Sequence, residues 1–139
     1  MTSQQVHLIR VTFRTLTPLT DQVAALFYAR LFELDPSLRG LFHGGLKQQG
    51  RKLMDMLSFA VSQLDQPAHL ETTLRELGAR HAGYGAKDGH YHTVGEALLW
   101  TLQQVLGGAF TPEVRTAWAD LYRFLSEAMR AHGTGHQAA

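Results

Sequence analysis

The residues of this chain best suited to chemistry are one tyrosine, one glutamine and one histidine. Tyr28, Gln49 and His81 lie in three separate segments, each at a position where helical spacing predicts a buried side chain. A phenol, an amide and an imidazole all need hydrogen-bond partners inside a core, because unpaired buried polar groups are costly. If they converge on one cavity, the imidazole offers a neutral nitrogen to a metal, and the other two offer hydrogen bonds to a small ligand.

The segment around His81 predicts a helix that carries this imidazole within its apolar face. Glycines at positions 83 and 85 end the helix, and Val94 opens an apolar face on the next one. One imidazole presented from a hydrophobic wall, beside an abrupt corner, suits a flat metal cofactor. The stripe recurs every three or four residues through Leu70, Leu74, Leu77, His81 and Tyr84.

Each of the three polar residues also has a purely structural interpretation. A histidine on an apolar helix face is often a core residue that is hydrogen-bonded to a backbone carbonyl. Tyr28 could be a core tyrosine whose hydroxyl reaches the surface. Gln49 could lie at the edge of its stripe and face water. The sequence alone leaves these alternatives open.

The elements that must position these residues are predicted to be helices throughout. All 4 prolines lie at predicted boundaries, where a residue without an amide proton is tolerated at a helix start. We find no alternating strand pattern of useful length and no internal repeat, and therefore predict an all-α fold of six or seven helices. The expected helices are residues 6–16, a second capped by Thr20 or Asp21, a short one at 36–42 capped by Asp35, then 46–64, 70–84, 91–106, and 113–131 capped by Thr111.

Composition limits both the architecture and the partners. The 139 residues suit one domain, which we assign to residues 1–132, with residues 133–139 as a disordered tail. The 13 Lys+Arg and 12 Asp+Glu give a formal charge of +1, so we expect neither nucleic acid nor a membrane surface as a partner. With 0 Cys, no export signal and no apolar run long enough to span a bilayer, we expect a cytoplasmic protein.

Taken together, these segments resemble a globin, of the single-domain bacterial kind related to flavohaemoglobin haem domains and to neuroglobin. The resemblance runs from the first helix to Ala131 and is strongest in LGARHAGYGAKDGHYHTVGEALL, which is similar to the stretch around the proximal histidine of those proteins. PSLRGLF resembles the haem-packing turn after the third helix, and QQGRKLM resembles the start of the distal helix. The resemblance implies a three-over-three helical sandwich that holds haem b, iron protoporphyrin IX.

The resemblance also assigns roles by position. It implies that His81 is the proximal iron ligand and that Tyr28, Gln49 and Leu53 form the distal pocket for a gas ligand. Because an amide is a poor donor to iron, Gln49 implies an open sixth position in the ferrous state. Lys52 could reach a haem propionate, or it could simply lie on a solvent-exposed helix face. Both interpretations explain a lysine at this position equally well. The further haem contacts implied are those of Phe42, Lys52, Leu53, Leu77, Tyr91 and Val94.

The function implied is reversible binding of dioxygen, or of nitric oxide or carbon monoxide, at the haem iron. A nitric oxide dioxygenase that works with a separate reductase is the main alternative, and a haem-based gas sensor is another. The resemblance to flavohaemoglobins weakens late in the last helix, because the glutamate that completes their proximal network has no match there. Glu127 is the nearest carboxylate. A haem-free helical bundle, in which His81 is a core residue, is the remaining alternative.

Overall fold

The computed structural model describes residues 1–42 and 44–138 of the chain, with side chains up to residue 131. Within these residues the fold is all-α, as predicted from the sequence, and contains no strand. Three short 3₁₀ helices are η1 (Thr17–Leu19), η2 (Pro36–Leu41) and η3 (Gly107–Ala109). The α-helices are α1 (Ser3–Leu16), α2 (Thr20–Leu34), α3 (Leu46–Ser62), α4 (Pro67–Gly83), α5 (Asp88–Leu106) and α6 (Pro112–Ala138).

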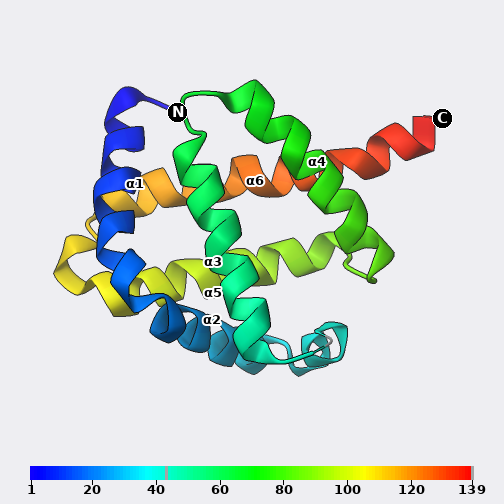
Figure 1. The fold of residues 1–139 in the computed structure, drawn as a ribbon, viewed down its shortest axis with the longest axis horizontal. Helices are drawn as coiled ribbons and strands as arrows, with labels where there is room; N and C mark the ends of the chain where they lie inside the picture. The colour runs from blue at the N-terminus through cyan, green and yellow to red at the C-terminus, as the bar shows by residue number, and fades with distance from the viewer. Residues whose placement is uncertain (43, 139) are drawn as a thin grey trace.

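The helices form two layers, with α1, α3 and α4 over α2, α5 and α6. Figure 1 shows α3 crossing in front of α5 and α6, and α4 crossing α6 near the C-terminal end of the chain. Among the described residues, α6 packs closely against α1, α4 and α5, while α2 packs closely against α3 and α5. The two helices that carry Gln49 and His81 are therefore held by different partners. This arrangement is the three-over-three sandwich predicted from the sequence.

A buried tryptophan joins the first helix to the last. Trp118 on α6 is fully buried, and its indole Nε1 donates a hydrogen bond of 2.9 Å to the Thr12 hydroxyl oxygen on α1. The Thr12 hydroxyl in turn donates to the Leu8 carbonyl at 2.8 Å. Because a buried indole N–H without an acceptor is costly, this pair fixes the register between α1 and α6.

Several predicted boundaries are corrected by the structure. The third helix is the 3₁₀ helix η2, although its predicted cap is confirmed, since the Asp35 carboxylate accepts from the Ser37 amide at 3.1 Å. Neither Thr20 nor Asp21 caps α2, because η1 leads directly into it and Leu19 occupies the cap position. The Thr111 cap of α6 is confirmed by its hydrogen bond from the Val114 amide.

Helices α1, α4, α5 and α6 begin earlier than predicted, since α1 begins at Ser3 and α6 at Pro112, and α6 also ends later. α4 begins at Pro67, since a proline is tolerated in the first turn. α5 begins at Asp88, because the His90 Nδ1 accepts from the Lys87 amide and completes its first turn. α6 continues past residue 131 to Ala138. Side chains from residue 132 onward lie outside the described part of the chain, so the predicted domain boundary at 132 and the disordered tail 133–139 stay predictions.

The fully buried face of α3 lies one position away from the predicted stripe. Helical spacing predicts a buried stripe on this helix through Leu46, Gln49, Leu53, Met56, Ala60 and Leu64. The predicted stripe shares Ala60 with the buried face, but Gln49 and Leu53 are only half-buried. A Cβ on Gly50 would lie 2.7 Å from the Ala24 Cβ, so the missing side chain lets α3 approach α2 along this face. The residues of α3 that are fully buried are Gly50, Met54, Leu57, Ala60 and Val61.

No helix among the described residues has the length and apolarity that a membrane crossing requires. The cytoplasmic location predicted from the sequence stays a prediction.

The crossing of α4 over α6 depends on a glycine. A Cβ on Gly78 would lie 1.9 Å from the Met129 carbonyl oxygen, so Gly78→Ala must push the two helices apart. We expect a loss of about 3 kcal/mol in the free energy of unfolding, measured by urea titration, because overpacking a rigid contact displaces backbone.

Gly83→Ala, on the same helix, is the matched control because nothing lies within 4 Å of its added Cβ. It should keep the stability of the parent chain or raise it by up to about 1 kcal/mol, since alanine favours helix over glycine. Equal stabilities for the two variants would show that α4 does not cross α6 at Gly78.

Candidate functional site

Tyr28 is the most deeply buried of the predicted site residues. Its side chain on α2 is 5% exposed and its ring lies 5.3 Å from the ring of Phe42, edge to face. Its hydroxyl donates a hydrogen bond of 3.1 Å to the main-chain carbonyl of Gln49. Burial raises the pKa of the Tyr28 phenol to about 12, so at neutral pH the hydroxyl is protonated and is a hydrogen-bond donor. Tyr28 therefore joins α2, the end of η2 and the start of α3.

The predicted distal residues of α3 lie on the half-buried side of that helix. Gln49 and Leu53 are both half-buried, four residues apart on one face, while Lys52 is exposed. The Leu53 side chain packs against the main core without being enclosed by it. This side of α3 is left partly open because the fully buried face packs against α2.

His81 makes the hydrogen bond that decides its tautomer. Its Nδ1 lies 2.9 Å from the Leu77 carbonyl oxygen, one helical turn earlier on α4. A carbonyl oxygen only accepts, so Nδ1 carries the proton and donates it. In the neutral imidazole with this tautomer, the lone pair is on the other ring nitrogen, Nε2, which is the form that binds a metal ion. The alternative of a core histidine bonded to a carbonyl is thus also the arrangement that prepares a metal ligand.

The corner after His81 is stabilised by its own backbone hydrogen bonds and lies against the end of η2. The His81 carbonyl accepts from the amides of Tyr84 and Ala86, each at 3.0 Å. Gly85 has a φ of 98°, which favours glycine, and a Cβ there would lie 3.4 Å from the Leu41 side chain. The corner therefore reverses the chain against the end of η2, next to Phe42.

Tyr91 lies on the side of α5 that faces α6. The Tyr122 hydroxyl donates to the Tyr91 carbonyl, and the Arg130 guanidinium lies 6.0 Å from the centre of the Tyr91 ring. Partial burial raises the pKa of the Tyr91 phenol, the Asp88 carboxylate raises it further and Arg130 opposes both. The contacts found for Tyr91 in the described residues are thus with α6, and its predicted contact with the cofactor stays a prediction.

The two helices of the predicted site do not pack closely against each other. α3 and α4 are not among the closely packed helix pairs of the described residues, since α3 packs on α2 and α4 on α6. The apolar residues predicted to contact the cofactor are each half-buried at the edge of the core. These residues are Phe42 at the end of η2, Leu53 on α3, Leu77 on α4 and Val94 on α5.

Comparison with known proteins identifies the family. Residues 25–129 match the Globin family. The chain belongs to the globin family. It is 33% identical to neuroglobin-1 of Oncorhynchus mykiss and 34% identical to neuroglobin of Tetraodon nigroviridis, in each case over 93% of this chain and 90% of the relative. These relatives support the predicted likeness to neuroglobin, whereas they give no support to the bacterial or flavohaemoglobin relation predicted from the sequence.

A solved structure supports the fold independently of close sequence similarity. The crystal structure of a hexacoordinated heme protein from an anhydrobiotic tardigrade, at pH 4, superposes with a TM-score of 0.85. The superposition covers 95% of this globin and 94% of that protein at 16% sequence identity. At this level of identity the likeness shows the globin fold alone.

The residues present fit the haem that the globin family implies. The donor is the Nε2 lone pair of His81, which is fixed by the bond from Nδ1 to the Leu77 carbonyl. The surroundings are half-buried apolar side chains on four elements, including Phe42 and Val94. A flat apolar cofactor that is held through one nitrogen ligand would need both features.

Sequence reasoning missed two residues that shape this region. The Phe32 ring stacks 6.0 Å from Tyr28 and lies edge to face 5.5 Å from Phe42, so it completes an aromatic cluster. Phe32 follows Tyr28 by four residues, and helical spacing could have found it. Leu41 contacts the corner at Gly85, and no sequence signal connects these distant positions.

The raised pKa of Tyr28 has a consequence for stability. The unfolded phenol ionises near 10 and the folded one near 12, so stability is fully present below about pH 10 and is lost as pH rises through about 12. Tyr28→Phe should lower the free energy of unfolding by about 1 kcal/mol at neutral pH, because the hydrogen bond is missing. The free energy of unfolding of this variant should also fall less steeply as the pH rises above about 10. Urea titrations of both proteins from pH 8 upward measure the difference. A parallel alkaline decline would contradict the burial of this hydroxyl.

Proposed function

We propose that this globin binds haem b through His81 and reversibly binds dioxygen and other diatomic gases. The observation that carries the proposal is the His81 Nδ1 to Leu77 carbonyl bond, which leaves Nε2 as a neutral, directed donor. When bound, haem supplies a ferrous iron with an open coordination position for a gas. The names of the neuroglobin relatives agree with this proposal, and so does the likeness to a heme protein.

The chain's own residues have separate tasks in this proposal. His81 on α4 would hold the iron, and the apolar side chains of Phe42, Leu53 and Val94 would keep water away from the haem. Tyr28 is a protonated donor at the distal side, and Gln49 adds a side-chain amide on α3. Two donors near a partly negative ligand slow its escape. Leu77 supplies both an apolar contact and the carbonyl that orients His81.

The Tyr28 hydroxyl must change its acceptor to help a gas ligand. It now donates to the Gln49 carbonyl at 3.1 Å, and a hydroxyl has one proton to donate. The torsion of a phenolic O–H is soft, so the proton can rotate from the carbonyl to a ligand while the oxygen stays in place. We therefore expect tight dioxygen binding, with Tyr28 as the main hydrogen-bond donor and Gln49 as the second donor.

Haem titration followed by absorption spectroscopy tests the proposal directly. The parent protein should give a sharp Soret band when ferric, and the band should shift after reduction and again with carbon monoxide. His81→Ala should lose or alter this band. His69→Ala is the matched control, because His69 lies on the same helix but is exposed and its ring contacts Phe59. It should behave as the parent does.

The same experiment distinguishes the haem-free alternative. If excess haem gives no band with the parent protein, the chain is a helical bundle in which His81 is only a core residue. If His81→Ala binds haem as the parent does, another side chain holds the iron and the assigned ligand is wrong.

Dioxygen release tests the distal pocket. Tyr28→Phe keeps the ring that packs on Phe42 but removes the donor, so stopped-flow displacement of dioxygen by carbon monoxide should show release several-fold faster than in the parent. Lys47→Met, at an exposed position on α3 that has no part in the proposed pocket, is the control and should leave the rate unchanged. An unchanged rate in Tyr28→Phe would show that this hydroxyl does not reach the ligand.

Nitric oxide turnover separates a carrier from a dioxygenase. A carrier whose oxygenated form meets nitric oxide reacts once and stays ferric, so we expect no sustained consumption of nitric oxide. Repeated turnover with a separate reductase and an electron source would instead indicate a nitric oxide dioxygenase, the alternative predicted from the sequence.

A further inference from the structure

A second candidate binding region lies between the start of α5 and the middle of α6. It is a shallow groove of about 280 Å³, lined on the α5 side by Asp88 and Tyr91 and on the α6 side by Ala119, Tyr122, Arg123 and Arg130. Its volume is at the lower end of the range for small-molecule sites, so the groove suits a small ligand. No part of the proposed gas-binding function uses its arginines.

The floor of the groove is rigid. A Cβ on Gly95 would lie 2.7 Å from the Tyr122 ring, so the missing side chain lets this ring lie directly on the α5 backbone. The Tyr122 hydroxyl donates to the Tyr91 carbonyl, which ties the ring across the two helices. Because the floor cannot collapse, the groove is maintained without an occupant.

The cations of the groove are positioned by contacts that leave donors available. The Arg130 guanidinium lies over the Tyr91 ring, and its Nε donates to the Ser126 carbonyl at 3.3 Å. In the described part of the chain its two Nη nitrogens have no partner. The Tyr91 hydroxyl likewise has none there, and its raised pKa keeps it protonated at neutral pH.

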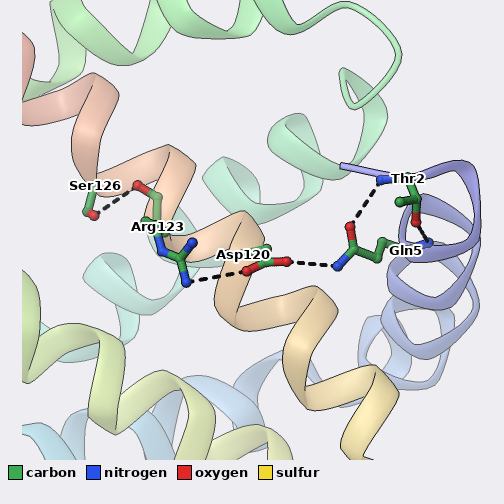
Figure 2. Close-up of polar contacts among 5 residues, drawn as sticks. All are labelled: Thr2, Gln5, Asp120, Arg123 and Ser126. Atoms are coloured by element: carbon green, nitrogen blue, oxygen red, sulfur yellow. Dashed lines mark hydrogen bonds and ion pairs between the residues drawn. The ribbon is translucent and has the colours of Figure 1, made fainter.

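A second arginine is held at the other end of the groove. Figure 2 shows Asp120 between Arg123 and Gln5. The Asp120 carboxylate accepts a hydrogen bond of 2.8 Å from the side-chain amide of Gln5 and lies 3.4 Å from the Arg123 guanidinium. Asp120 thus points toward α1 and orients Arg123 without lining the groove. The lining itself has two guanidinium groups against the single carboxylate of Asp88. Asp120 already pairs with Arg123, so the cation of the groove without a carboxylate partner among the described residues is Arg130, which offers N–H donors beside the Tyr91 hydroxyl.

We propose that this groove binds a small oxyanion, a carboxylate or a phosphate, with Arg130 and Tyr91 as the principal donors and Arg123 as the second cation. Guanidinium groups match the geometry of carboxylate and phosphate oxygens and form charge-assisted hydrogen bonds with them. The Asp88 carboxylate on the opposite wall selects against highly charged anions, since each added charge increases its repulsion. The observations behind this site do not rest on the proposed function, and Tyr91 is the one residue that the groove shares with the implied haem contacts.

Nuclear magnetic resonance titration of the full-length protein tests the site. Inorganic phosphate and succinate are added in separate series at constant ionic strength, and the Ala119 amide and Arg130 Nε–H signals are followed. We expect saturable shifts with at least one anion. The series that saturates at the lower concentration identifies the oxyanion class.

Three variants locate the binding. Arg130→Gln should weaken it about tenfold, because the charge-assisted contacts are lost. Tyr91→Phe should weaken it by a smaller factor, since the ring stays and the hydroxyl is removed. Arg115→Gln is the matched control on α6, and should bind as the parent does because Arg115 is exposed and does not line the groove.

Two results would overturn the proposal. The first is a linear drift of the signals with both anions, which would indicate screening of surface charge alone. The second is saturable binding that Arg130→Gln and Tyr91→Phe leave unchanged, which would place the anion elsewhere. Circular dichroism of each variant shows that a loss of binding does not reflect a loss of fold.

Discussion

The hydrogen bond from His81 Nδ1 to the Leu77 carbonyl is the interaction on which the candidate site depends. It fixes the proton of the neutral ring on Nδ1 and so leaves Nε2 as the nitrogen that can bind a metal ion. Its geometry requires α4 to be regular between these two residues, and α4 is held in place by the close crossing of Gly78 with the Met129 backbone. The corner at Gly85, packed against Leu41, then fixes where the helix ends. A change in any of these contacts redirects the imidazole.

The partner of His81 also sets its chemical character. A backbone carbonyl is a neutral acceptor and polarises the Nδ1–H bond less than a carboxylate does, so it gives the ring less imidazolate character. In the flavohaemoglobin pattern a glutamate completes this network, whereas here the nearest sequence counterpart, Glu127, is exposed on α6. A weakly polarised proximal ligand favours gas binding over activation of the gas, which agrees with the proposed carrier role. The Tyr91 carbonyl accepts from Tyr122 and its ring lies beside Arg130, while its implied contact with the cofactor stays a prediction.

Much of the fold could be predicted from the sequence because the helical signals are local. Proline positions, the Asp35 and Thr111 caps and the stripe from Leu70 to Leu77 each follow from contacts within one turn. The burial of Tyr28 was likewise visible in the pattern of α2. The exact buried face of α3 was not, because it depends on how closely Gly50 approaches Ala24 on another helix. The groove at Arg130 was missed for the same reason, since its parts come from two helices distant in sequence.

Resonance Raman spectroscopy of the ferrous, haem-loaded protein tests the central claim most directly, because the iron–histidine stretching band reports both the ligand and the state of its ring. The bond from His81 to the Leu77 carbonyl predicts a band in the range of a neutral imidazole, present in the parent and absent in His81→Ala. A band that persists in His81→Ala would show that a different histidine holds the iron. A band in the imidazolate range would show that Nδ1 donates to a carboxylate instead of the Leu77 carbonyl.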